Sequence, residues 1–262
     1  MALPTPASTL NILSPQSSSP TSTRAAVILP GLGNNSGDYR SLCRTLTDGY
    51  GIPTAVAKVS RFDWLRNAAG LVDSNYWRGT LSPRPVLNWY LERVVAAVAE
   101  AKKLCSEGGR IALIGHSAGG WLARVYMKEF GWSDISLLLT LGTPHLYIRG
   151  AQFISNLDSN IIAQVDDDRG ASVLVKKEGT VKSTPVAPTM RARFIGQGYK
   201  QVCGKADVWG DGVVPEMSAH LDGALNISLD GVYHSPVGSD ELLRPWYGSP
   251  SVVQQWIAHL LN

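Results

Sequence analysis

The stretch Arg110-Ile-Ala-Leu-Ile-Gly-His-Ser-Ala-Gly-Gly120 joins a short apolar run to the pattern Gly-x-Ser-x-Gly. The run predicts a buried strand, and the residues after the pattern predict a helix. A serine on such a turn has a strained backbone that exposes its hydroxyl group. Small residues two positions before and after it avoid collisions with the neighbouring strand and helix. Ser117 is therefore a candidate nucleophile; the alternative is a Gly-Ser turn that matches the pattern by chance.

The segment before this strand predicts a strand–loop–helix–strand unit. Small and β-branched residues over 25–30 indicate a buried strand, and residues 53–59 indicate a second one. Between them lie a glycine loop at 31–35 and a helix that Asp38 can cap. The inward face of that helix is expected to carry Tyr39, Leu42 and Leu46. This order predicts a parallel sheet, and the loop lacks the full Gly-x-Gly-x-x-Gly pattern of a dinucleotide site.

The rest of the chain continues the alternation of strands and helices. Apolar and periodic stretches predict a helix over 86–105, strands over 135–141, 193–198 and 225–229, and a closing helix that starts at Ser249-Pro250. Residues 146–188 carry charge runs and few long apolar runs, so we interpret them as a cap or lid insertion over the site. The predicted fold class is α/β, with a doubly wound, mainly parallel sheet in one domain over 25–262.

Composition excludes several classes of protein. The 262 residues are 44% hydrophobic, which suits one large domain. A net charge of +3 with dispersed Lys and Arg residues argues against a nucleic-acid partner. Cys43, Cys105 and Cys203 lack metal-binding spacing, so we expect no metal site and a reducing compartment. The apolar runs are too short for a transmembrane segment, which leaves peripheral membrane contact open.

The first 24 residues differ from the domain that follows. They are rich in Ser, Thr and Pro, contain no acidic residue and reach their first basic residue at Arg24. Such leaders are typical of plastid transit peptides, so we predict a chloroplast location. The alternative is a disordered tail on a cytoplasmic protein.

A serine nucleophile needs a base that accepts its proton and an acid that orients the base. In a fold of this kind these groups follow the serine in the order Asp or Glu, then His, each on a loop after a strand. Asp211 lies between two glycines, and His234 follows the last predicted strand. We therefore predict a catalytic triad of Ser117, Asp211 and His234. The alternatives are Asp207 and Asp222 as the acid and His220 as the base.

The reaction also needs main-chain donors for the negative charge that develops on the substrate oxygen. The amide of Ala118 is one candidate, because it follows the nucleophile at a helix N-terminus. The amide of Leu32 on the first glycine loop is the other, with Gly33 as an alternative to it.

Four further side chains are candidates to line a substrate pocket: His116, His145, Trp64 and Trp77. The tryptophans lie in the connection over 60–85, which has no clear period and is long enough to suggest a functional role. The alternative is that they only fix this long loop to the body of the domain.

Four motifs together resemble those of lipase-type α/β-hydrolases. They are Pro-Gly-Leu-Gly33, Gly-His-Ser-Ala-Gly-Gly120, Leu-Gly-Thr-Pro-His145 and Gly-Asp-Gly-Val-Val-Pro215. The resemblance covers roughly residues 25–261 and is closest to small plant and cyanobacterial proteins similar to GPI inositol-deacylases. It implies the α/β-hydrolase fold, an acyl-serine intermediate and no cofactor. The chain departs from the family at Pro30, where these lipases commonly carry a structural histidine. This departure puts in question the geometry of the oxyanion loop, which is the glycine loop at 31–35 that carries Leu32.

These features predict a serine hydrolase that cleaves an acyl ester, either a small molecule or a lipid. The lipid preference rests on the resemblance and on the predicted cap. An acyltransferase would use the same acyl-enzyme but exclude water. A hormone receptor or another ligand-binding module of the same fold is the alternative outside enzymes.

Overall fold

The structure of the chain, a computed structural model, describes residues 24–78, 81–145, 172–177, 199–200, 205 and 207–262. For residues 76–77 and 172–177 it describes the backbone alone. The predicted strand over 193–198, the leader before Arg24 and most of the predicted insertion over 146–188 lie outside the described residues.

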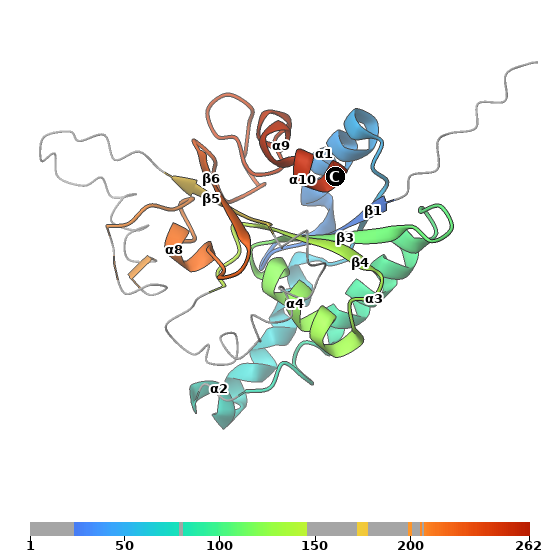
Figure 1. Cartoon of the computed structure of the whole chain (residues 1–262). Helices are drawn as coiled ribbons and strands as arrows, with labels where there is room; N and C mark the ends of the chain where they lie inside the picture. Colours follow the sequence, from blue (N-terminus) through green and yellow to red (C-terminus); the bar gives the residue numbers. More distant parts are fainter. Residues whose placement is uncertain (1–23, 79–80, 146–171, 178–198, 201–204, 206) are drawn as a thin grey trace, which may run out of the picture.

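A parallel sheet of six strands, in the order β2-β1-β3-β4-β5-β6, forms the centre of the domain (Figure 1). Its strands are β1 (Arg24–Leu29), β2 (Thr54–Val56), β3 (Arg110–His116), β4 (Ile135–Leu141), β5 (Ser172–Lys177) and β6 (Leu225–Asp230). Every pair of neighbouring strands is parallel. The chain turns back at β1, which lies between β2 and β3, and ligands of such sheets bind outside the carboxyl ends of the strands at this point.

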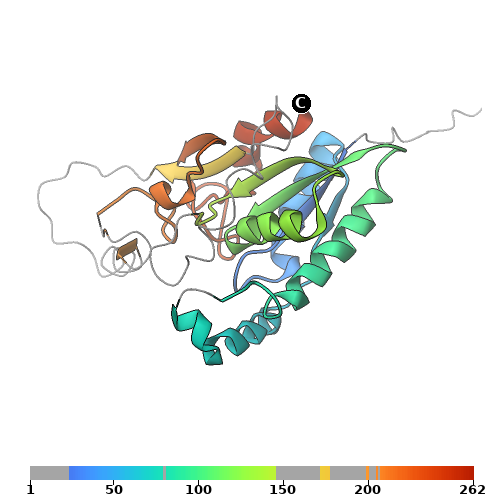
Figure 2. The same ribbon diagram turned by 60° about the horizontal axis from the view of Figure 1, so that its bottom comes forward.

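Helices cover both faces of the sheet (Figures 1 and 2). The residues of β1 alternate between the two layers. On one face α3 (Asn88–Lys102) and α4 (Ala118–Phe130) pack against Ala25, Val27 and Leu29. On the other face α1 (Arg40–Arg44), α9 (Pro250–Trp256) and α10 (Ala258–Leu261) pack with Ala26 and Ile28. The predicted doubly wound α/β class is confirmed.

Three glycines allow α4 to lie directly against the sheet. A Cβ at Gly115 would lie 2.3 Å from the Cα of Gly120, and a Cβ at Gly119 would lie 2.1 Å from the carbonyl oxygen of Leu29. A Cβ at Gly120 would lie 2.0 Å from the Thr143 hydroxyl oxygen. No real side chain fits at these distances, so the glycine spacing of the pattern is a packing requirement.

Several predicted elements have different bounds in the structure. The short helical pieces are η1 (Ser36–Tyr39), η2 (Thr45–Gly49), η3 (Arg61–Val72), α2 (Ser74–Arg78) and α8 (Glu216–Ala219). Asn35, not Asp38, occupies the N-cap of η1; the Asp38 carboxylate accepts from the Asn35 amide at 3.0 Å, as in a capping box. The connection over 60–85 contains η3 and α2. Its sequence has no clear period because η3 is a 3-10 helix, which does not follow the 3.6-residue pattern.

Part of the predicted insertion belongs to the sheet. Ser172–Lys177 form β5, which pairs with β4 on one side and β6 on the other. The charged pair Lys176-Lys177 at its end explains why apolar runs do not predict this strand, and the interpretation of 146–188 as a cap or lid stays a prediction.

We predict that Gly119→Ala lowers the free energy of unfolding by about 1–3 kcal/mol, because the added methyl group collides with the backbone of β1. Urea denaturation followed by circular dichroism measures this change.

Gly49→Ala is the matched control, since a Cβ at Gly49 meets nothing within 4 Å. Its stability should stay within about 0.5 kcal/mol of the wild type. Equal losses in the two variants would contradict the packing explanation.

Candidate active site

Ser117 lies at the junction of β3 and α4 with φ 52° and ψ −127°. Among the described residues it is the one non-glycine with positive φ. Such a conformation costs about 1–3 kcal/mol and persists only where the surroundings enforce it. Here the Ser117 amide donates to the Leu141 carbonyl at 2.9 Å, which fixes the turn at the end of β4. The predicted strained turn is confirmed, and the half-buried side chain stands at the carboxyl edge of the sheet.

Asp211 and His234 form a buried pair. The Nδ1 of His234 lies 2.6 Å from the Oδ2 of Asp211, and the two residues are 8% and 1% exposed respectively. The His234 amide also donates to the Asp211 carbonyl at 3.1 Å, so the two loops are joined by main chain and side chain. The structure therefore brings together the predicted acid and the predicted base.

The Asp211 carboxylate accepts hydrogen bonds from every side. Its Oδ1 accepts from the amides of Val213 at 3.0 Å and Val214 at 2.7 Å, and its Oδ2 accepts from the Tyr247 hydroxyl at 2.9 Å as well as from His234. Burial is the largest single influence and raises the pKa of Asp211, but the charge of a protonated His234 and these hydrogen bonds together lower it below its usual value. The carboxylate stays ionised and holds the imidazole with a proton on Nδ1.

Ser117 is linked to this pair through its neighbours on β3 and β4. The ring of His116, the residue before Ser117, lies 4.8 Å from the ring of His234 between centroids. A Cβ at Gly142, which follows Leu141, would lie 2.6 Å from the Oδ2 of Asp211. No hydrogen bond joins the Ser117 hydroxyl to His234 among the residues that the structure describes, so this last contact stays a prediction.

Of the two predicted amide donors, Ala118 follows Ser117 directly in the chain, and Leu32 follows Gly31, which lies next to Ser117. Ala118 is the first residue of α4, where main-chain amides have no acceptor within the helix. Gly31 lies against Ser117, because a Cβ at Gly31 would be 2.7 Å from the Cβ of Ser117. Leu32 follows Gly31 in a turn closed by the amide of Asn34, and its own amide makes no hydrogen bond to any described residue.

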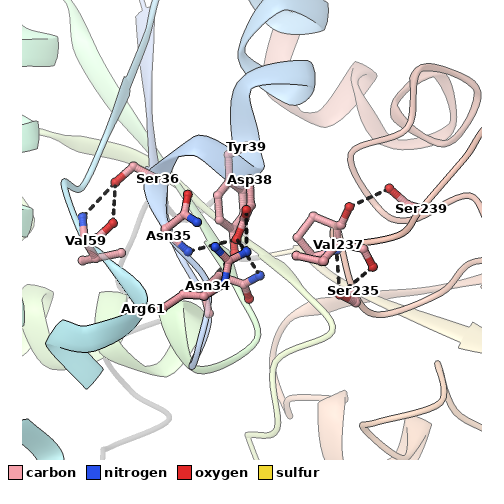
Figure 3. Close-up of polar contacts among 12 residues, drawn as sticks. Asn34, Asn35, Ser36, Asp38, Tyr39, Val59, Arg61, Ser235, Val237 and Ser239 are labelled. Atoms are coloured by element: carbon pink, nitrogen blue, oxygen red, sulfur yellow. Dashed lines mark hydrogen bonds and ion pairs between the residues drawn. The ribbon is translucent and has the colours of Figure 1, made fainter. Parts of the chain in front are cut away.

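A polar network holds this loop from the outside (Figure 3). Arg61 donates to both carboxylate oxygens of Asp38 at 2.9 Å, and the Asn34 side chain donates to the same carboxylate at 3.3 Å. The Trp64 indole donates to the Asn34 carbonyl at 2.8 Å. On the opposite side of the view lies the loop that carries Ser235 and Val237.

The four pocket candidates lie in different surroundings. Trp64 is 7% exposed and packs on Trp89 and Tyr90 with ring centroids 5.3 Å apart in both pairs, so its ring fixes the long connection to the domain. Trp77 lies on α2, where the structure describes only its backbone. His116 and His145 are each 1% exposed. A lining role for these residues stays a prediction.

His145 is enclosed beneath α4. Its Nδ1 lies 3.4 Å from a guanidinium nitrogen of Arg124, and its Nε2 lies 3.2 Å from the Thr140 hydroxyl. Burial, and then the charge of Arg124, lowers the pKa of His145 to about 3. The imidazole is thus a neutral part of the interior.

The rival residues lie elsewhere. Asp207 and Asp222 are exposed, and the Nε2 of His220 lies 3.9 Å from the Glu216 carboxylate one helical turn away.

Within the described ranges, no three His, Cys, Asp or Glu side chains gather as a metal site would require. In the described part of the chain, no helix has the length and apolar character of a membrane span.

Two tyrosines at the site escape prediction from sequence. Tyr39 is expected only as a core residue of its helix, yet its hydroxyl lies 2.7 Å from the Nδ1 of His116. Tyr247 lies before the last helix and bonds Asp211. Their partners are 77 and 36 residues away in the chain, and no local pattern signals such contacts.

Comparisons with known proteins find one matching family model and similar solved structures. The family model described as PGAP1-like alpha/beta domain matches residues 84–166, which include β3, Ser117 and β4. Phospholipase PlaB from Legionella pneumophila superposes with a TM-score of 0.52 at 12% identity, over 88% of this chain and 59% of that one. Est1E from Butyrivibrio proteoclasticus gives a TM-score of 0.47 at 13% identity, over 94% and 92%. No curated protein sequence matches the chain.

Burial of the neutral His145 side chain predicts that the stability of the protein depends on pH. With a pKa of about 3 in the folded state for His145, and about 6.5 in an unfolded chain, only the unfolded chain binds this proton between those values. Stability should therefore fall as the pH falls from about 6.5 towards about 3, by up to about 1.4 kcal/mol per pH unit from this group. Urea denaturation at pH 6.5 and at pH 5.0 measures this change. Between these two pH values, the free energy of unfolding of His145→Gln should fall by about 2 kcal/mol less than that of the wild type.

Thr140→Val is the control, since it removes the hydroxyl partner of His145 but no titrating group. Its stability should run parallel to that of the wild type at all pH values. A His145→Gln variant with the wild-type pH slope would refute the assignment.

Proposed function

The chain has the α/β-hydrolase fold, and from that premise we propose that it is a serine hydrolase that cleaves acyl esters through an acyl-serine intermediate. The nucleophile is Ser117, the base is His234, and Asp211 orients the base. The observation that carries the proposal is the buried 2.6 Å contact between Asp211 and His234, beside a serine held at positive φ.

The first step is attack of the Ser117 hydroxyl oxygen on the ester carbonyl carbon. Since Asp211 holds a proton on Nδ1, the Nε2 of His234 carries the lone pair that accepts the serine proton. The imidazolium then donates this proton to the leaving alkoxide oxygen, and the ester C–O bond breaks. A water molecule, deprotonated by the same nitrogen, then attacks the acyl carbon; the bond to the Ser117 oxygen breaks, the imidazolium returns the proton to that oxygen, and the acid is released.

The amides of Leu32 and Ala118 are the proposed donors to the tetrahedral oxyanion. Support for Leu32 comes from its neighbour Gly31, which lies against Ser117, and the Ala118 amide adds the favourable end of the α4 dipole. Removal of one such donor in other enzymes costs about 100- to 1,000-fold in kcat.

We propose that the acyl group is apolar. Each of the three loops that carry the site exposes a large apolar side chain: Leu32 at 62%, Val213 at 52% and Val237 at 51%. Apolar groups this exposed near a polar centre suit contact with a lipid-like acyl chain or with a membrane surface that presents one.

A fluorophosphonate probe tests the reaction with the intact protein. The wild type should be labelled on Ser117 and should hydrolyse p-nitrophenyl esters. Ser117→Ala should abolish labelling, and His234→Ala and Asp211→Asn should each lower kcat by about 1,000- to 10,000-fold.

The matched controls are His220→Ala and Asp222→Asn, which alter the rival residues and should retain wild-type kcat. A panel of esters of graded acyl length reports the substrate class, and longer chains should give higher kcat/KM. Labelling without turnover of any ester would favour a binding module, and acyl transfer to an added alcohol in preference to water would favour an acyltransferase.

A further inference from the structure

We propose that Tyr39 and His116 are positioning residues, which tie the oxyanion loop to the catalytic histidine through one continuous chain of hydrogen bonds. This inference rests on the proposed function, because it gives the second residue of the Gly-x-Ser-x-Gly pattern a role in that reaction.

The chain of contacts runs from one catalytic segment to another through the interior. The amide of Gly31 donates to the Tyr39 hydroxyl oxygen at 2.9 Å. That oxygen lies 2.7 Å from the Nδ1 of His116, and the Nε2 of His116 lies 2.9 Å from the main-chain carbonyl oxygen of His234. Three contacts therefore connect the residue before Leu32 to the main chain of the base.

Chemistry fixes the direction of each hydrogen bond. The carbonyl of His234 can only accept, so the Nε2 of His116 must donate to it. Burial, the largest influence, lowers the pKa of His116 to about 3, so the ring is neutral and its Nδ1 has a lone pair. The Tyr39 hydroxyl donates to that nitrogen, and its oxygen accepts from Gly31. One tautomer thus satisfies every polar atom of the chain.

Packing prevents these side chains from adjusting. Tyr39 is 0% and His116 1% exposed. The edges of both rings meet Trp246, with centroid distances of 5.7 Å for Tyr39 and 5.6 Å for His116. A Cβ at Gly31 would lie 3.0 Å from the Nδ1 of His116, so the loop rests directly on the imidazole. In an interior this dense, a shift at one end is transmitted to the other.

Other anchors of the loop do not reach the base. The Tyr90 hydroxyl donates to the Pro30 carbonyl at 2.8 Å, and the Trp64 indole to that of Asn34 at 2.8 Å. These bonds attach the loop to α3 and η3, whereas the Tyr39 hydroxyl attaches it to His116 and so to His234. The Tyr39–His116 chain therefore gives this loop a further buried polar support.

The test removes the Tyr39 hydroxyl and keeps its ring. In Tyr39→Phe the Gly31 amide and the His116 Nδ1 lose their partner, and the loop is no longer tied to the base. We expect kcat per labelled active site to fall about 10- to 100-fold, less than for direct loss of an oxyanion donor, while KM changes by less than about 3-fold. Titration with the fluorophosphonate counts the active sites, so loss of folded protein does not enter kcat.

Ser136→Ala is the matched control. It removes another buried hydroxyl, which donates to the Ile111 carbonyl at 3.2 Å at the opposite end of the sheet. It should lower the melting temperature but keep kcat per active site. A Tyr39→Phe variant that loses only melting temperature, as Ser136→Ala does, would overturn the inference.

A second pair of variants tests the imidazole. His116→Gln can place an amide donor near the position of Nε2 and should retain at least about 5-fold more kcat than His116→Ala, which offers no donor. Equal kcat in these two variants would overturn the coupling to His234. A wild type that is neither labelled nor active would instead refute the proposed function, and the inference with it.

Discussion

The close approach of α4 to the sheet is the constraint on which the site depends. Because Gly115 and Gly119 carry no Cβ, the helix begins one residue after β3 ends, and Ser117 is forced into a conformation with φ 52°. The strain is held by this close packing and by the hydrogen bond from the Ser117 amide to the Leu141 carbonyl. In the proposed reaction, a serine fixed in this way loses little freedom when the substrate binds.

The second requirement is electrostatic. A buried carboxylate is costly unless hydrogen bonds compensate it, and Asp211 receives them from two main-chain amides, an imidazole and the Tyr247 hydroxyl. Its ionised state then dictates which nitrogen of His234 carries the proton. The segment before α8, which carries Asp211, and the loop after β6, which carries His234, are thus joined by this buried charge.

The sequence reveals those parts of the molecule whose physics is local. The glycine spacing predicts the strained turn at Ser117. The chain order and the surrounding turns predict Asp211 and His234 as the acid and the base. The contacts of Tyr39 and Tyr247 depend on tertiary packing between distant segments. From the sequence alone, such a tyrosine can be predicted only as a core residue, without its hydrogen-bond partner. The strand β5 ends in a charged pair and lies in a segment of mixed character, which explains why apolar runs do not predict it.

Convergence of five groups is the central claim: one hydroxyl, one imidazole, one carboxylate and two main-chain amides. A crystal structure of the protein inactivated by an alkyl fluorophosphonate tests it most directly, because the phosphonyl oxygen imitates the oxyanion. We expect phosphorus bonded to the Ser117 oxygen, with the phosphonyl oxygen about 2.7–3.1 Å from the amides of Leu32 and Ala118 and with His234 beside the ester oxygen. A phosphonyl oxygen directed into solvent, away from both amides, would contradict the account.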